Sequence, residues 1–304
     1  MNPLLLAALS ALIWGSTDLV TTYVGRRIGS LRVVVIAVSV SALVAGGMAI
    51  ARGLLTTPLD PEIAGLNVLF GVGAGISYIA VFTAFRLGPL SVVSPTVAAY
   101  GVLAAFLATI FLAERFSGAN ALGVLAVGVG IVLLGIRTTG SGRDRRASLA
   151  SPGVAFALVG LVSFALITVL LTIPIHAFGW SAAIALSRIG NLITVWLIFG
   201  ALRARRSDLP RWGRTDLLGD GQRLDGRGIL LASLVGVGDT VAFFAFAAAL
   251  EDGATWAVSL LSSLGPIVVV LGGLIGYKER LRLPQVAGLA FVAVGVLLAT
   301  LPLG

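Results

Sequence analysis

The sequence of 304 residues contains no cysteine and only one histidine. Without cysteine the chain can form neither disulfides nor thiolate metal sites, and it has no thiol nucleophile. His176 alone cannot supply the paired imidazoles of a histidine metal site. No Walker motif, nucleophile elbow or paired-carboxylate signature stands out. The sequence therefore predicts no metal, no cofactor and no enzymatic activity.

Charge is also scarce. Charged residues make up 11% of the chain and hydrophobic residues 58%, and the mean hydropathy is +1.06. A soluble protein has about 25% charged residues. The net charge of +8 comes from arginines in short segments between apolar runs, which is the pattern of membrane proteins and not of nucleic-acid binding. We therefore predict a multi-pass protein whose partner is the lipid bilayer, with no nucleic acid.

Long apolar runs dominate the rest of the sequence. A membrane-spanning helix needs about 20 mostly apolar residues. Ten runs approach or exceed this length, so we predict an all-α integral membrane protein with ten transmembrane helices. The runs are Leu4–Gly25, Leu31–Ala51, Ile63–Phe85, Leu90–Ala113, Ala119–Ile136, Gly153–Ile175, Ser181–Leu202, Ile229–Leu250, Ala254–Tyr277 and Gln285–Leu301.

The second half of the chain repeats the first. The stretch that begins at Leu87 aligns without a gap with the stretch that begins at Asp252, each residue meeting the one 165 positions later. Glu114-Arg115 thereby meets Glu279-Arg280, and Ser94 meets Ser259. We predict a five-helix repeat over residues 1–136, a polar linker over 137–151 and a second repeat over 152–304.

An odd number of helices in each repeat makes the second repeat enter the membrane from the opposite side. This is an inverted-topology repeat with a pseudo-two-fold axis in the membrane plane. If each half adopts either of two shapes, exchange of the shapes exposes a central cavity to the other side. The repeat therefore predicts alternating access, and hence a transporter. Both repeats lie in one chain, so a monomer would suffice.

The same residues resemble a known family. The stretch Ala-Leu-Ile-Trp-Gly-Ser at residues 11–16, the two Glu-Arg turns and the Gly-x6-Gly helices after them resemble the EamA family of the drug/metabolite transporter superfamily. The resemblance covers nearly the whole chain as two EamA repeats. It implies ten helices, a central cavity, and export or exchange of small metabolites such as amino acids.

Ionisable residues within the apolar runs are the main candidates for a binding site, because charge at depth is costly in a membrane. Asp239 lies near the middle of the eighth run, where it either binds a proton or substrate amine or is paired for packing. Asp18 either lines the cavity or reaches the interface. Arg188 binds a substrate carboxylate, pairs with Asp239 or Asp18, or snorkels to the interface. Asn191 shares its face at i+3.

Other polar, aromatic and proline residues extend the candidate site. The aromatic candidates either contact a ligand or serve packing and the interfacial belt. The two serines at equivalent repeat positions either reach a ligand or bond to their own helix. The prolines lie inside the fourth and ninth runs, where they are hinge candidates or ordinary membrane prolines. These residues are Trp14, Tyr78, Tyr100, Trp256, Ser94, Ser259, Pro95 and Pro266.

The arginines are unequally divided between the two sides of the predicted membrane protein. The odd-numbered loops between the runs hold nearly all the Lys and Arg, including Arg26, Arg27, Arg143, Arg145 and Arg146. The second and fourth loops hold only Arg52 and Arg115. The positive-inside rule then places both termini outside. We expect the protein in the plasma (inner) membrane.

We therefore predict a secondary active transporter for a small-molecule metabolite, an exporter or exchanger coupled to a proton or a counter-substrate. The alternatives are a channel, a lipid or amphiphile flippase, a membrane enzyme, and a non-transporting membrane scaffold, in which the inverted repeat would have no clear use. An enzyme would need convergent catalytic groups, and the sequence shows only isolated carboxylates. Saturable uptake with exchange would separate a carrier from a channel.

Overall fold

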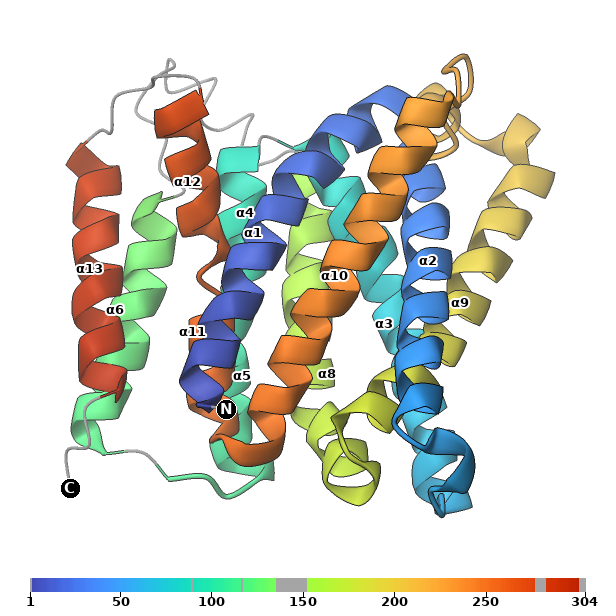
Figure 1. Ribbon diagram of the computed structural model, residues 1–304. Coiled ribbons are helices and arrows are strands. Elements are labelled where there is room, and N and C mark those ends of the chain that lie inside the picture. The colour runs from blue at the N-terminus through green and yellow to red at the C-terminus, as the bar shows by residue number, and fades with distance from the viewer. Residues whose placement is uncertain (1, 89, 116, 135–151, 277–282, 301–304) are drawn as a thin grey trace.

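The computed structural model describes residues 2–88, 90–115, 117–134, 152–276 and 283–300. Within these ranges the secondary structure is helical throughout (Figure 1), which confirms the all-α prediction. The predicted linker at residues 137–151 and the Glu279-Arg280 turn lie outside the described residues.

Local sequence signals set where the helices of the first half begin and end. α1 begins at Pro3, where the Asn2 side chain accepts a hydrogen bond from the Leu4 amide, and ends before Gly29, whose φ is 98°. Asp60 caps α3 in the same way, again with a proline at the first position. The helices are α1 (Pro3–Ile28), α2 (Ser30–Ala51), α3 (Pro61–Leu87), α4 (Leu90–Ala98), α5 (Tyr100–Phe111) and α6 (Gly118–Leu134), with a short 3₁₀ turn, η1 (Leu54–Thr56).

The second half uses similar signals. α9 follows Gly179, whose φ is 81°, and Asp225 caps α10 by accepting a hydrogen bond from the Gly228 amide at 2.9 Å. The helices are α8 (Pro152–Phe178), α9 (Trp180–Ala204), α10 (Gly226–Asp252), α11 (Thr255–Ser262), α12 (Gly265–Gly276) and α13 (Leu283–Thr300), with the short turns η2 (Arg206–Asp208) and η3 (Gly213–Leu217) between α9 and α10.

Seven helices of the described chain are long and apolar enough to cross a membrane by themselves. Six of them are α1, α2, α3, α8, α9 and α10, and the seventh combines most of α4 with α5. Three further helices are apolar but shorter, over residues 118–134, 255–269 and 283–298. The protein is therefore a multi-pass membrane protein, and ten crossings remain a prediction.

Two predicted runs are divided. The fourth run breaks at Ala99, one turn after Pro95, and the ninth breaks at residues 263–264, immediately before Gly265-Pro266. At Ala99 the bonds to the carbonyl four residues back continue, from Ala99 to Pro95 and from Leu103 to Ala99. At the second break Pro266 supplies no amide hydrogen to the helix, and Leu264 and Ile267 bond to the carbonyl three residues back instead of four. Ala99 and Leu264 are 165 positions apart, so the two breaks lie at the same place in the repeat.

Helices of one half pack mainly on helices of the other. α1 packs on α10 as α8 packs on α3, and α2 packs on α10 as α9 packs on α3. α6 and α13, which stand at one edge of the bundle in Figure 1, form the most extensive pair. A Cβ built on Gly130 would lie 2.7 Å from the Gly288 carbonyl oxygen, so the backbones of α6 and α13 touch there.

The segment between α9 and α10 is fixed to one end of the bundle, which we call the arginine-rich face. Arg86 of α3 pairs with Asp216 at 2.7 Å, and Arg27 of α1 pairs with Asp225 at 2.6 Å. The backbone hydrogen bond from Gly228 and the nearby Arg27 guanidinium hold the pKa of Asp225 below its ordinary value. These contacts hold a polar connection against the ends of the membrane helices.

The opposite face carries a cap that crosses between the halves. Glu114, just after α5, accepts hydrogen bonds from the backbone amides of Thr255 at 2.8 Å and Trp256 at 3.0 Å. A carboxylate at a helix N-terminus satisfies free amides and complements the helix dipole. Glu114 therefore caps α11, a helix of the other half.

Candidate functional site

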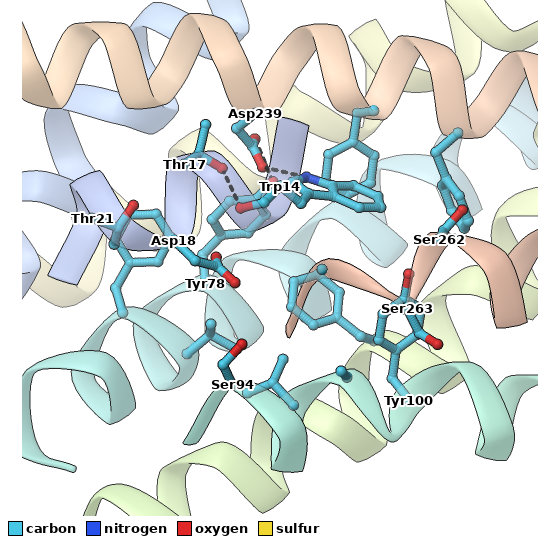
Figure 2. Close-up of a pocket in the computed structure, with 18 of the residues that line it drawn as sticks. Trp14, Thr17, Asp18, Thr21, Tyr78, Ser94, Tyr100, Asp239, Ser262 and Ser263 are labelled. Atoms are coloured by element: carbon cyan, nitrogen blue, oxygen red, sulfur yellow. Dashed lines mark hydrogen bonds between the residues drawn. The ribbon is translucent and has the colours of Figure 1, made fainter. Parts of the chain in front are cut away.

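A cavity of about 90 Å³ lies inside the bundle, between helices of both halves. Figure 2 shows its polar side chains approaching from several helices. Four helices each contribute residues at the spacing i, i+4, i+7, which places them on one helical face. These residues are Trp14, Asp18 and Thr21 of α1, Tyr78, Phe82 and Phe85 of α3, Phe164, Thr168 and Leu171 of α8, and Asp239, Phe243 and Phe246 of α10.

Asp239 occupies one wall of the cavity and forms a buried ion pair. Its Oδ2 lies 3.0 Å from an Arg188 guanidinium nitrogen and accepts a hydrogen bond from the Tyr78 hydroxyl at 2.6 Å. Its Oδ1 accepts from the Trp14 indole at 3.2 Å. The second terminal nitrogen of Arg188 lies 3.0 Å from the Tyr78 oxygen. The carboxylate of Asp239 is therefore compensated by a cation and two further donors.

Arg188 lies behind this wall and does not line the cavity. Arg188 as a whole residue is 3% exposed. The guanidinium carbon lies 4.6 Å from the centre of the Phe243 ring and 5.2 Å from that of Tyr78. Cation–π contact adds to the ion pair in holding the charge. The sequence allowed Arg188 to pair with either Asp239 or Asp18, and in the structure it pairs with Asp239.

Asp18 also lines the cavity, one turn along α1 from Trp14. No hydrogen bond or ion pair joins its carboxylate to any side chain in the part of the chain that the structure describes. The two intramembrane aspartates therefore differ: Asp239 is paired, whereas Asp18 presents a free carboxylate to the cavity.

Two cavity-lining hydroxyls are buried without partners. The residues are Ser94 of α4, 3% exposed, and Tyr100 of α5, 8% exposed. Neither the Ser94 Oγ nor the Tyr100 hydroxyl forms a hydrogen bond within the described chain. Buried polar groups normally have partners, so these two oxygens are free to bond to a molecule in the cavity.

The remaining sequence candidates lie outside the cavity, Pro266 excepted, since it lines the wall where α12 begins. Asn191 is buried on α9 with both side-chain amide atoms unpartnered. The Ser259 hydroxyl bonds back to the Thr255 carbonyl of its own helix. Trp256 packs in an apolar cluster, and Pro95 lies inside α4.

Sequence reasoning missed several polar lining residues, namely Thr17, Thr21, Thr168, Ser262 and Ser263. Threonine and serine are ordinary in membrane helices, so each alone gives no signal. The shared i, i+4, i+7 spacing of polar and aromatic residues on four helices was the available signal. In the described residues no group of three or more His, Asp or Glu side chains is placed to hold a metal.

Comparison with known proteins gives a family. A model of the EamA-like transporter family matches residues 1–136 and again residues 151–301. No curated protein matches the sequence. One solved structure, described only as "Crystal structure of protein", aligns with 98% of this chain and 96% of its own at 18% identity and a TM-score of 0.70. At that identity the similarity shows the fold alone. The family model covers nearly the whole chain in two matches, and the chain therefore belongs to the EamA-like transporter family.

Proposed function

We propose that this protein is a secondary active transporter that moves a small metabolite by alternating access around the cavity between its two halves. Helices at corresponding places in the two halves pack on each other's partners, α1 on α10 as α8 on α3. This packing supports an inverted repeat of five spans in each half. The breaks at Ala99 and at residues 263–264 support it further, because the adjacent Ala98 and Tyr100 and the residue Ser263 line the cavity. Broken helices near the bilayer midplane are typical of binding sites in inverted-repeat transporters.

The free carboxylate of Asp18 carries this proposal. An ionised carboxylate in an apolar surrounding is unfavourable unless a cation compensates it. Asp239 already has its cation in Arg188. Asp18 therefore needs a proton or a cationic group of the substrate whenever the cavity is closed to water. That requirement couples the occupancy of the cavity to its reorientation.

The network around Asp239 positions the cavity wall. It joins Trp14 of α1, Tyr78 of α3, Arg188 of α9 and Asp239 itself on α10. The network ties together four helices, two from each half. We assign Asp239 and Arg188 a positioning role and Asp18 the binding role.

The test is counterflow in liposomes that contain the purified protein. Separate batches of vesicles are loaded with unlabelled alanine, tetramethylammonium or glucose. The uptake of the same compound in labelled form is then measured for each batch. A carrier gives saturable uptake of at least one compound, driven by the same compound inside. The uptake falls about tenfold or more in Asp18→Asn, because the counter-charge is lost. Glu62→Gln, which removes an exposed carboxylate at the start of α3, is the matched control and transports normally.

Flux that rises linearly with concentration, without counterflow, would instead support the channel. Counterflow of full size in a folded Asp18→Asn protein would refute the role of Asp18.

A further inference from the structure

The charge balance of the cavity indicates the charge of its ligand. Asp239 and Arg188 together are neutral, and Asp18, when ionised, adds one negative charge without a partner. No lysine or arginine side chain lines the cavity in the described residues. A ligand with one positive charge would leave the cavity neutral, and a carboxylate would find no counter-cation there.

The walls also favour a cation. Eight aromatic side chains line the cavity, among them Trp14, Phe82 and Phe164. Aromatic faces attract ammonium groups, and the attraction is stronger where water is excluded. Aromatic rings surrounding a carboxylate form the type of site that recognises amines.

The unpartnered hydroxyls supply further acceptors. A primary ammonium group has three N–H donors. The Asp18 carboxylate can accept one, and the free oxygens of Ser94 and Tyr100 can each accept another. All three residues line the same cavity (Figure 2). A quaternary ammonium, which has no N–H, would use only the charge and the rings.

The volume limits the size of the ligand. A cavity of about 150 Å³ in another protein holds benzene, so one of about 90 Å³ accepts a smaller molecule. Propylamine, with three carbons, is of this size. Its amino-acid counterpart, 2-aminobutyrate, differs from it only by the added carboxylate.

On these grounds, and resting on the proposed transport function, we propose that the cavity binds a short-chain primary alkylammonium ion and discriminates against the corresponding α-amino acid. Asp18 is the counter-ion, and Ser94 and Tyr100 accept the remaining N–H groups. The proposal separates this chain from a carrier of amino acids, which would need a cation for the substrate carboxylate.

The experiment compares propylamine, 2-aminobutyrate and 1-propanol by calorimetric titration of the purified protein in detergent at pH 7. We expect propylamine to bind at least about tenfold more tightly than either of the others, since only propylamine gains the charge without adding an unpaired carboxylate. Equal or tighter binding of 2-aminobutyrate, or no detectable binding of propylamine, would overturn the proposal.

Three variants locate the site. Asp18→Asn should weaken propylamine binding about tenfold or more, while Asp18→Glu keeps the preference for the amine. Tyr100→Phe should weaken the binding of propylamine and leave that of tetramethylammonium unchanged, because only the first donates a hydrogen bond. Tyr23→Phe, at an exposed tyrosine of α1, is the matched control. Unchanged propylamine binding in a folded Asp18→Asn protein, judged by gel filtration, overturns the proposal.

Binding and transport fail separately. If propylamine binds as described but neither propylamine nor any compound of the panel shows counterflow, the chemistry of the site stands and the transport function fails. If alanine shows saturable counterflow while propylamine does not bind, the transport function stands and the alkylammonium proposal fails.

Discussion

At the residue scale, two intramembrane aspartates have opposite surroundings. Asp239 receives donors from three helices, and Asp18 receives none from any described side chain. Burial of an ion pair is a weak source of stability, but removal of one partner leaves an uncompensated charge. The two residues should therefore respond differently to the same substitution.

Asp239→Asn should destabilise the protein by about 3 kcal/mol or more, because Arg188 then remains buried without a counter-charge. The thermal unfolding midpoint in detergent measures the effect. Asp239→Asn combined with Arg188→Gln removes both charges and should recover most of the loss. Asp208→Asn, at an exposed position of η2, should leave the midpoint unchanged. A midpoint for Asp239→Asn equal to that of the wild type would contradict the role of the pair.

The sequence predicted that both aspartates lie within apolar helices and offered Arg188 as a partner of either, but it could not decide between them. Arg188 and Asp239 are 51 residues apart and on different helices, so their contact depends on how α9 and α10 pack. The sequence also treated Ser94 and Ser259 alike because they are equivalent in the repeat. In the structure Ser94 lines the cavity and Ser259 bonds to its own helix, because the two halves do not contribute equally to the cavity.

At the scale of helices, glycine allows α3 and α9 to touch. A Cβ built on Gly190 of α9 would overlap the Val68 carbonyl of α3, and one on Gly71 would overlap the Ser187 carbonyl. Backbone atoms cannot move aside as a flexible side chain can. Close approach through small residues is a main source of helix association in membranes.

Gly190→Ala should therefore lower the thermal midpoint by several degrees, because the added methyl pushes α9 away from α3. Gly200→Ala is the matched control, since a Cβ at this position of the same helix meets nothing within 4 Å. The control should be neutral or slightly stabilising, because alanine favours helix more than glycine. Equal effects of the two substitutions would show that the α3–α9 contact tolerates a methyl group.

The helices were largely predictable because twenty apolar residues in a row give a strong and local signal. The first run, predicted over Leu4–Gly25, is observed as Pro3–Ile28. The breaks in the fourth and ninth runs were anticipated only as kinks, since Pro95 and Pro266 signal a lost hydrogen bond but not whether the helix ends. The cap that Glu114 provides to α11 required the tertiary fold.

At the scale of the whole molecule, the arginines divide the surface into two unlike ends. The ends of α1 and α3 and the segment between α9 and α10 form the arginine-rich face, whereas α1 begins and α13 ends at the opposite face (Figure 1). The positive-inside rule places the arginine-rich face in the cytoplasm. We propose that the protein lies in the plasma membrane with both termini on the outer side.

Single cysteines test this orientation directly, because the chain has none of its own. Leu55→Cys, at an exposed position after α2, should react in intact cells with a thiol reagent that does not cross membranes. Ser207→Cys, in the segment between α9 and α10, should react only after the membrane is opened. The reverse pattern would place the termini in the cytoplasm.

Every helix of the first half has its most extensive contacts with a helix of the second half. During synthesis, α1 to α6 are therefore made before any of their main partners exists. At about 5–20 residues per second, roughly 10–30 s separate the completion of α6 from that of α13. Throughout that interval the glycine face of α6 lacks its partner α13, whereas that of α3 lacks its partner only until α9 is made. The nascent first half is thus an assembly intermediate, and in this interval membrane chaperones and quality-control proteases compete for the chain.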